Sequence, residues 1–285
     1  MRFIGRHAGT FLAVVLVLGG CCAHAGEFSG YNFRQEMRDF VKALSAYARQ
    51  VDPDFIVIPQ NGQELITTNG EADGPLAAGY VAAINGQGRE DLFYGYEEDN
   101  VATPEGESAY MIEFLDRCET VGVEVLVTDY CSTPAFMDDS YMRNAAKGYA
   151  SFAADRRELD NVPMYPATPV GVNTGNVVGL ADAQNFLYLL DPGPFATKQD
   201  YLDTLTGSAY DLFILDLFYE EALTPADLAA LHTKPQGGTR LRIAYMSIGE
   251  AEDYRYYFRP EWLVEPPTWL RAVSGHTVPK CGCGP

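Results

Sequence analysis

Short, strongly apolar segments alternate with longer amphipathic ones along this chain, and this alternation constrains the fold more than any other feature. Residues 211–218 are almost entirely apolar, and residues 54–59 and 123–130 are similar. Residues 34–51 lie between such segments and have helical periodicity, with Met37, Phe40, Val41, Leu44 and Tyr47 on one helical face. Strands that are apolar on both faces and joined by helices form parallel sheets. The sequence therefore predicts an α/β fold.

The number of predicted strands narrows this fold class. We expect helices at residues 34–51, 108–120, 139–157, 198–205 and 224–231, and a long loop at residues 169–180. We expect strands at residues 54–59, 80–85, 123–130, 161–166, 185–191 and 211–218, and one beginning at Arg240. The commonest closed parallel sheet has eight strands. The prediction is a (β/α)8 TIM-barrel-like domain with about seven strands present and one missing.

The N-terminus has the pattern of an export signal. Arg2 and Arg6 precede an apolar run at residues 11–18, and cleavage is expected after Ala25. The four residues that end at Cys21 also resemble a bacterial lipobox, in which the cysteine carries lipid. We therefore expect an exported protein that is secreted, periplasmic or lipid-anchored at the cell envelope.

The remaining chain is expected to form one domain. Residues 1–25 are interpreted as the signal peptide, residues 26–270 as a single barrel-sized domain, and residues 271–285 as an unpatterned tail. Cys118 and Cys131 flank a predicted strand of about 26 Å, so we expect both thiols to be unpaired. No histidine or cysteine spacing predicts a metal site or a cofactor.

The formal net charge of −19 bears on partners. It argues against nucleic acid, whose phosphates require a basic surface. It favours a cationic partner through long-range attraction, although acidity can also serve only to keep an exported protein soluble. No membrane contact is expected beyond a lipid anchor.

Polar side chains follow several predicted strands. Active sites of parallel α/β folds lie at the carboxyl ends of their strands. We expect Asn61, Glu90, Asp129, Asp216 and Glu250 to converge on one opening. Glu90 and Asp216 are the candidate catalytic carboxylates. The candidate substrate-binding residues are Gln60, Asn61, Asp91, Asp129, Tyr130, Tyr245, Ser247, Glu250, Tyr254 and Arg255.

A purely structural interpretation is open for each of these groups. Glu90 can pair with Arg89, and Asp129 can form a structural bond at the end of its strand. Gln60 and Asn61 can cap the next helix, and the charges after Gly249 can form an ion-pair network. Tyrosines are ordinary core and rim residues.

Five segments together resemble glycoside hydrolase family 114, the endo-α-1,4-polygalactosaminidases with a TIM-barrel fold. They are residues 31–40, 58–62, 88–94, 126–132 and 247–255, within a likeness that extends over about residues 31–270. The resemblance implies cleavage of galactosamine or N-acetylgalactosamine polymers, and Glu90 matches the family's catalytic glutamate.

One departure from this family leaves a second hypothesis open. Members continue after a segment like residues 266–270 with a strand that carries a catalytic aspartate, and nothing similar follows here. The alternative to the glycosidase is a truncated, catalytically incomplete barrel that binds saccharide or is inactive.

Overall fold

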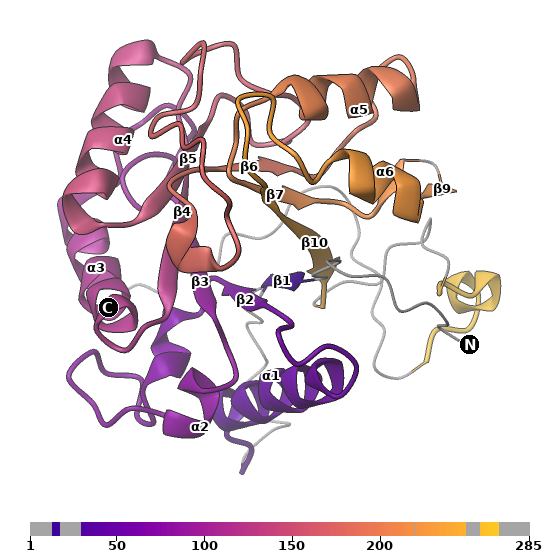
Figure 1. Cartoon of the computed structure of the whole chain (residues 1–285). Coiled ribbons are helices and arrows are strands. Elements are labelled where there is room, and N and C mark those ends of the chain that lie inside the picture. The colour runs from indigo at the N-terminus through magenta and orange to yellow at the C-terminus, as the bar shows by residue number, and fades with distance from the viewer. Residues whose placement is uncertain (1–12, 18–29, 220, 249–256, 268–285) are drawn as a thin grey trace.

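The computed structural model describes residues 13–17, 30–219, 221–248 and 257–267 of the chain (Figure 1). The predictions for Cys21, Glu250, Tyr254, Arg255 and the tail at residues 271–285 fall outside these residues. Among the described residues, no helix combines the length and the apolar character that a membrane crossing requires.

The molecule is built on an eight-stranded sheet with the strand order β5-β4-β3-β2-β1-β10-β7-β6. All of its strand pairs are parallel, and an isolated parallel bridge joins Ser151 to Asn185, at the two ends of this order. The strands are β1 (Ala13–Val17), β2 (Val57–Gln60), β3 (Gly86–Glu90), β4 (Glu124–Tyr130), β5 (Ala150–Ala154), β6 (Phe186–Leu189), β7 (Leu212–Leu215) and β10 (Leu241–Ser247). The predicted parallel α/β fold is confirmed.

Helices lie around the outside of these strands in Figure 1. They are α1 (Phe33–Arg49), α2 (Ala78–Val81), α3 (Glu105–Thr120), α4 (Pro134–Lys147), α5 (Lys198–Gly207) and α6 (Pro225–Ala230). Short 3-10 turns are η1 (Gln63–Ile66), η2 (Leu180–Asp182) and η3 (Pro260–Leu263), and a small antiparallel hairpin pairs β8 (Phe218–Tyr219) with β9 (Glu221–Ala222).

Local sequence explains where several helices begin and end. The Asn32 side chain accepts a hydrogen bond from the backbone N–H of Gln35 and so caps α1. Thr224 and Asp227 form a reciprocal capping box at the start of α6. Gly148 takes a left-handed φ of 83° and ends α4 at Lys147.

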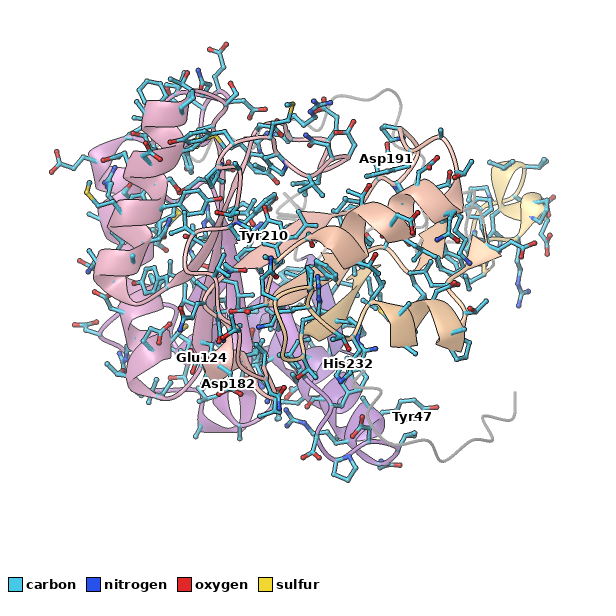
Figure 2. The ribbon with its side chains drawn as sticks, turned by 45° about the horizontal axis from the view of Figure 1, so that its top comes forward. Tyr47, Glu124, Asp182, Asp191, Tyr210 and His232 are labelled. Carbon is cyan, nitrogen blue, oxygen red and sulfur yellow. The ribbon has the colours of Figure 1, made fainter. Side chains whose placement is uncertain are left out.

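The apolar face of α1 is only partly covered. Val41 is fully buried, whereas Phe40 and Tyr47 on the flank of that face are 46% and 73% exposed. Tyr47 is labelled in Figure 2. Amphipathic periodicity identified the helix correctly, and the neighbouring elements decide how much of its apolar arc is covered.

Two predicted strands are wrong. Residues 80–85 overlap helix α2, and the strand is β3, directly after them. Residues 161–166 form no strand; β5 lies instead at Ala150–Ala154, inside the helix predicted for residues 139–157. β5 is rich in alanine and β3 contains glycine, so the local sequence of each favours a strand only weakly. Both strands form because they pair with β4.

Seven of the eight strands come from residues 57–247, the number that the sequence predicts. The eighth is β1, which pairs with β2 and β10 and has Val14 opposite both Val57 and Ala244. This segment belongs to the apolar run interpreted above as the core of an export signal. Export itself stays a prediction.

Around β2 and β4, the two faces of the sheet pack into different cores. Successive residues of β4 alternate between them: Leu126 and Tyr130 belong to one cluster, and Val125 and Val127 to the other. The second cluster includes Val41 of α1 and Phe114 of α3, so it is the helix-covered face. We call the opposite face, which carries Leu126 and Tyr130, the inner face. Cys118 and Cys131 are buried free thiols, as predicted.

Candidate functional site

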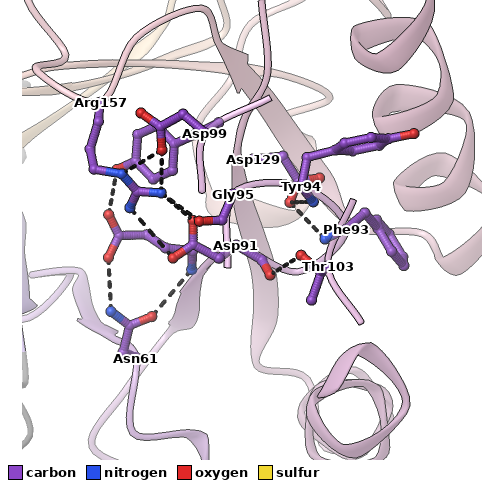
Figure 3. Close-up of polar contacts among 11 residues, drawn as sticks. Asn61, Asp91, Phe93, Tyr94, Gly95, Asp99, Thr103, Asp129 and Arg157 are labelled. Atoms are coloured by element: carbon purple, nitrogen blue, oxygen red, sulfur yellow. Dashed lines mark hydrogen bonds and ion pairs between the residues drawn. The ribbon is translucent and has the colours of Figure 1, made fainter. Parts of the chain in front are cut away.

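Three neighbouring strands end in residues that contact one another. Asn61 follows β2, Glu90 is the last residue of β3, and Tyr130 is the last residue of β4. Glu90 accepts hydrogen bonds on both carboxylate oxygens, from Asn61 Nδ2 at 2.8 Å and from the Tyr130 hydroxyl at 2.5 Å. The backbone N–H of Glu90 donates to Asn61 Oδ1 at 3.2 Å, which completes a two-way pair (Figure 3). We call Asn61, Glu90 and Tyr130 the carboxylate cluster.

Backbone conformation directs these side chains. Asn61 has a φ of 61° and Asp91 a φ of 60°, so both strands turn through the left-handed region as they end. Asparagine and aspartate tolerate this region better than other residues with a Cβ. The Asn61 turn is held by its N–H, which donates to the carbonyl oxygen of Gly88 at 2.8 Å. The turn leaves the Asn61 amide facing Glu90.

Tyrosines form much of the surroundings of Glu90. Burial, with the charge of Glu90 and the hydrogen bond to it, raises the pKa of Tyr130 well above its ordinary value. Burial and the Glu90 charge likewise raise the pKa of Tyr188, in the middle of β6. Both phenols therefore remain protonated over the physiological range. The ring of Tyr188 lies 6.5 Å, between centroids, from that of Tyr245 on β10.

An arginine outside the predicted set borders the carboxylate cluster. Arg157 Nη2 donates to Asp91 Oδ1 at 2.9 Å and to the carbonyl oxygen of Gly95 at 2.8 Å, and Nε donates to Asp99 at 2.7 Å (Figure 3). Its guanidinium carbon lies 3.9 Å from the centroid of the Tyr130 ring. Burial raises the pKa of Asp91, and the hydrogen bond from Arg157 opposes that rise.

Asp129 does not join the cluster. It is fully buried, and it points toward the helix-covered face, where Ser140 and Asn144 of α4 donate to Oδ2 at 2.6 and 3.3 Å. Its Oδ1 accepts the backbone N–H groups of Phe93 and Tyr94 at 2.8 and 3.2 Å (Figure 3). Neighbours on a strand point to opposite faces, so Tyr130 and Asp129 cannot share one opening. The substrate-binding prediction for Asp129 is therefore replaced by a structural role.

The other described candidates lie at strand ends of the same edge. Gln60 ends β2 and is 3% exposed, and its Nε2 has no hydrogen-bond partner within the described residues. Asp216 directly follows β7, is 8% exposed and accepts the N–H of Phe218 at 3.0 Å. Ser247 ends β10 and is partly exposed. Of the five groups expected to converge, the structure joins Asn61 to Glu90 and turns Asp129 away.

Sequence reasoning missed two residues of this region. Tyr188 lies within an apolar strand, where an aromatic residue is indistinguishable from core. Arg157 lies at the end of a segment predicted as helix. Within the described part of the chain, His, Cys, Asp and Glu side chains form no group of three or more that could hold a metal ion.

No family model matches the chain. An uncharacterized protein of Methanocaldococcus jannaschii is 30% identical over 117 residues, which are 41% of this chain and 33% of that protein. Uncharacterized proteins of Thermotoga maritima and Deinococcus radiodurans are 31% identical over 108 residues and 28% identical over 123 residues. These matches cover 38% and 43% of this chain, and 30% and 36% of the relatives. The chain therefore spans about a third of the length of the curated relatives it matches.

Proposed function

We propose that the chain is an exported glycoside hydrolase that cleaves polymers of galactosamine or N-acetylgalactosamine. Removal of the signal peptide would also remove β1, so the seven remaining parallel strands of the exported form would make a TIM-type barrel that lacks one strand, with the site at the carboxyl ends of the strands. The bridge between Ser151 and Asn185 supports closure, because it pairs the strands at the two ends of the sheet order. The resemblance to glycoside hydrolase family 114 supplies the reaction and the sugar.

The observation that carries the proposal is the hydrogen bonding of Glu90. Hydrolysis of a glycosidic bond generally uses two carboxyl groups, one as acid and one as base or nucleophile. Both oxygens of Glu90 accept hydrogen bonds, an arrangement that suits an ionised carboxylate. Glu90 would therefore act as the base or nucleophile. Asp216, at the carboxyl end of β7, is the proposed partner that protonates the leaving oxygen.

The surroundings of Glu90 suit a sugar. Asn61 offers an amide that donates and accepts, and the buried Gln60 Nε2 is a donor with no partner among the described residues. The ring of Tyr245, which is only partly buried and is backed by the buried ring of Tyr188, provides an apolar face on which a pyranose can stack. The net charge of −19 would attract a partly deacetylated, cationic polymer. Glu250, Tyr254 and Arg255, which lie outside the described residues, stay in the proposed substrate-binding set.

Turnover by matched variants tests this function. Purified protein is incubated with partly deacetylated and with fully acetylated α-1,4-galactosamine polymer, and new reducing ends are measured. Glu90→Gln should lose at least about 100-fold in rate, the range for removal of an acid or base. Glu98→Gln, on the exposed loop eight residues later, should retain the wild-type rate. The proposal is wrong if the wild type releases no reducing ends from either polymer, or if Glu90→Gln is as fast as the wild type.

A non-catalytic saccharide-binding barrel is the second candidate. The unpartnered donor of Gln60 favours it, because a buried amide without a partner is stabilised by any ligand that accepts its hydrogen bond. In that case the wild type and Glu90→Gln would both bind galactosamine oligosaccharides in calorimetry, and neither would release reducing ends. Gln60→Leu should then weaken binding.

A further inference from the structure

One guanidinium connects the ends of three strands beside Glu90. Arg157 follows β5, and it binds Asp91, directly after β3, and the carbonyl oxygen of Gly95 on the same loop. Its guanidinium covers the ring of Tyr130, the last residue of β4, at 3.9 Å. Asp99 Oδ1 accepts a hydrogen bond from Arg157 Nε at 2.7 Å and forms an ion pair with Nη2 at 2.6 Å. The loop after β3 and the ring of Tyr130 are thus held by the same planar group.

The backbone around this contact leaves room for the guanidinium. A Cβ on Gly95, which has a φ of 111°, would lie 2.5 Å from Asp91 Oδ1 and 3.1 Å from Arg157 Nη2. The position therefore requires glycine for its conformation and for its lack of a side chain. The same loop returns to β4 through Asn100, whose N–H donates to the carbonyl oxygen of Tyr130 at 2.9 Å. Backbone and side chain of Tyr130 are both tied to this loop.

The position of the Tyr130 ring determines one of the two hydrogen bonds to Glu90. The hydroxyl lies at the far end of a rigid ring and contacts Glu90 Oε1 at 2.5 Å. A tilt of the ring therefore moves the hydroxyl more than any other atom of the side chain. Arg157 covers the ring face and so opposes that tilt, and its ion pair fixes Asp91, the residue adjacent to Glu90.

We propose that Arg157 is a positioning residue, which holds the Tyr130 hydroxyl against Glu90 and sets the orientation of that carboxylate. This inference rests on the proposed function, because it assigns Arg157 a part in the same reaction. It acts through Tyr130 and Asp91 and does not itself contact the reacting atoms. Lysine cannot replace it, because a single ammonium cannot lie flat on the ring and bind Asp91, Asp99 and Gly95 together.

The chain provides a closely matched control. Arg156 is the preceding residue, has the same side chain and is similarly exposed, but its ion pairs are with Asp155 at 3.9 Å and Asp160 at 3.4 Å. Arg156→Lys therefore makes the same chemical change without touching Tyr130 or the loop after β3.

The experiment compares Arg157→Lys, Arg156→Lys, Tyr130→Phe and the Arg157→Lys/Tyr130→Phe double variant below their melting temperatures. Arg157→Lys should lower kcat about 10- to 100-fold, the scale expected when a catalytic group is misplaced by about 1 Å, with KM changed less than kcat. The double variant should be no slower than Tyr130→Phe, because both changes remove one coupled interaction. Equal kcat for Arg157→Lys and Arg156→Lys, or fully multiplicative losses in the double variant, would overturn the proposal.

A second readout does not depend on turnover. In tyrosine-labelled protein, NMR should show a slowly exchanging hydroxyl proton that Tyr130→Phe removes and thereby assigns. Arg157→Lys should shift or broaden this resonance, and Arg156→Lys should leave it unchanged. An unchanged resonance in Arg157→Lys would show that Arg157 does not position Tyr130, even if the wild type hydrolyses nothing. Absence of turnover with an altered resonance would reject the proposed function and keep the positioning role.

Discussion

Asp129 offers the sharpest test of how this site is held, because the structure turns it away from the opening that the sequence predicted for it. Its four hydrogen bonds connect β4, the segment after β3 and helix α4. Asp129→Ala removes every acceptor at once. The backbone N–H groups of Phe93 and Tyr94 and the hydroxyl of Ser140 would lose their acceptor, and Asn144 would keep only its hydrogen bonds to Ser140.

The expected loss of stability follows from the burial of these donors. Each buried donor left without an acceptor costs about 1–3 kcal/mol. The two backbone N–H groups alone give about 2–6 kcal/mol. Ser140 and Asn144 are also fully buried, which limits any recovery by solvent. We expect Asp129→Ala to lower the free energy of unfolding by about 4 kcal/mol, a large share of the roughly 5–15 kcal/mol of a typical protein.

Asp129→Asn is the matched control. Its side-chain oxygen can still accept both backbone N–H groups, and its amide can donate to Ser140, so we expect a loss of about 1 kcal/mol at neutral pH. Burial raises the pKa of Asp129 above its ordinary value of 3.8. The native wild type then binds more protons than the unfolded chain just above pH 3.8, so its stability falls as pH rises through that window. Asp129→Asn has no carboxyl group at this position and so lacks this pH dependence. Its loss of stability relative to wild type should therefore be smallest at higher pH.

Urea denaturation monitored by circular dichroism, at several pH values, measures these differences. A cost below about 1 kcal/mol for Asp129→Ala would refute the reasoning from buried donors. Saccharide affinity and kcat should be unaffected by Asp129→Asn in protein that remains folded. A selective loss of affinity there would return Asp129 to the binding site.

Two further predictions concern the amino-terminal side of β7 and β10. Lys234→Met should lower the free energy of unfolding in urea by about 3–5 kcal/mol, because Lys234 Nζ donates to Asp211 at 2.6 Å and both side chains are fully buried. The Lys234→Met/Asp211→Asn double variant should recover part of this loss. A loss below about 1 kcal/mol for Lys234→Met would contradict the prediction. Burial, and then the nearby charge of Arg242, lower the pKa of His232, which is labelled in Figure 2. Just below pH 6.5 the unfolded chain therefore binds more protons than the native protein, and the stability of the native protein should fall as pH drops through that value. His232→Gln should flatten this decline between pH 7 and 5 in thermal melts, and an identical pH dependence in both proteins would rule the histidine out as its source.

Strands with a continuous apolar pattern were predictable, and strands without one were not. Residues 123–130 were expected as a strand and match β4 closely, because seven successive residues suit burial on two faces. β3 contains two glycines, an arginine and a glutamate, so no local pattern favours it. A Cβ on Gly88 would lie 1.9 Å from Gln60 Oε1, which shows that the strand is selected by its fit against β2.

The residues of the candidate site likewise divide into those that the sequence predicted and those that it placed wrongly or missed. Glu90 and Asn61 were identified from their positions after predicted strands, and the structure joins them at 2.8 Å. Asp129 was misplaced because strand phase, which decides the face a residue occupies, depends on register with the neighbours. Arg157 contacts residues 62 and 66 positions away in sequence, and no local pattern signals such a partner.

The sequence by itself determined that this chain forms a parallel α/β sheet and that carboxylates and amides follow its strands, because periodicity and turn residues are properties of a few adjacent positions. Only the tertiary structure decided that β1 lies between β2 and β10, that Tyr130 and Arg157 meet beside Glu90, and that Asp129 faces the helices. Those outcomes depend on register and on contacts between distant segments, for which one sequence carries no local physical signal.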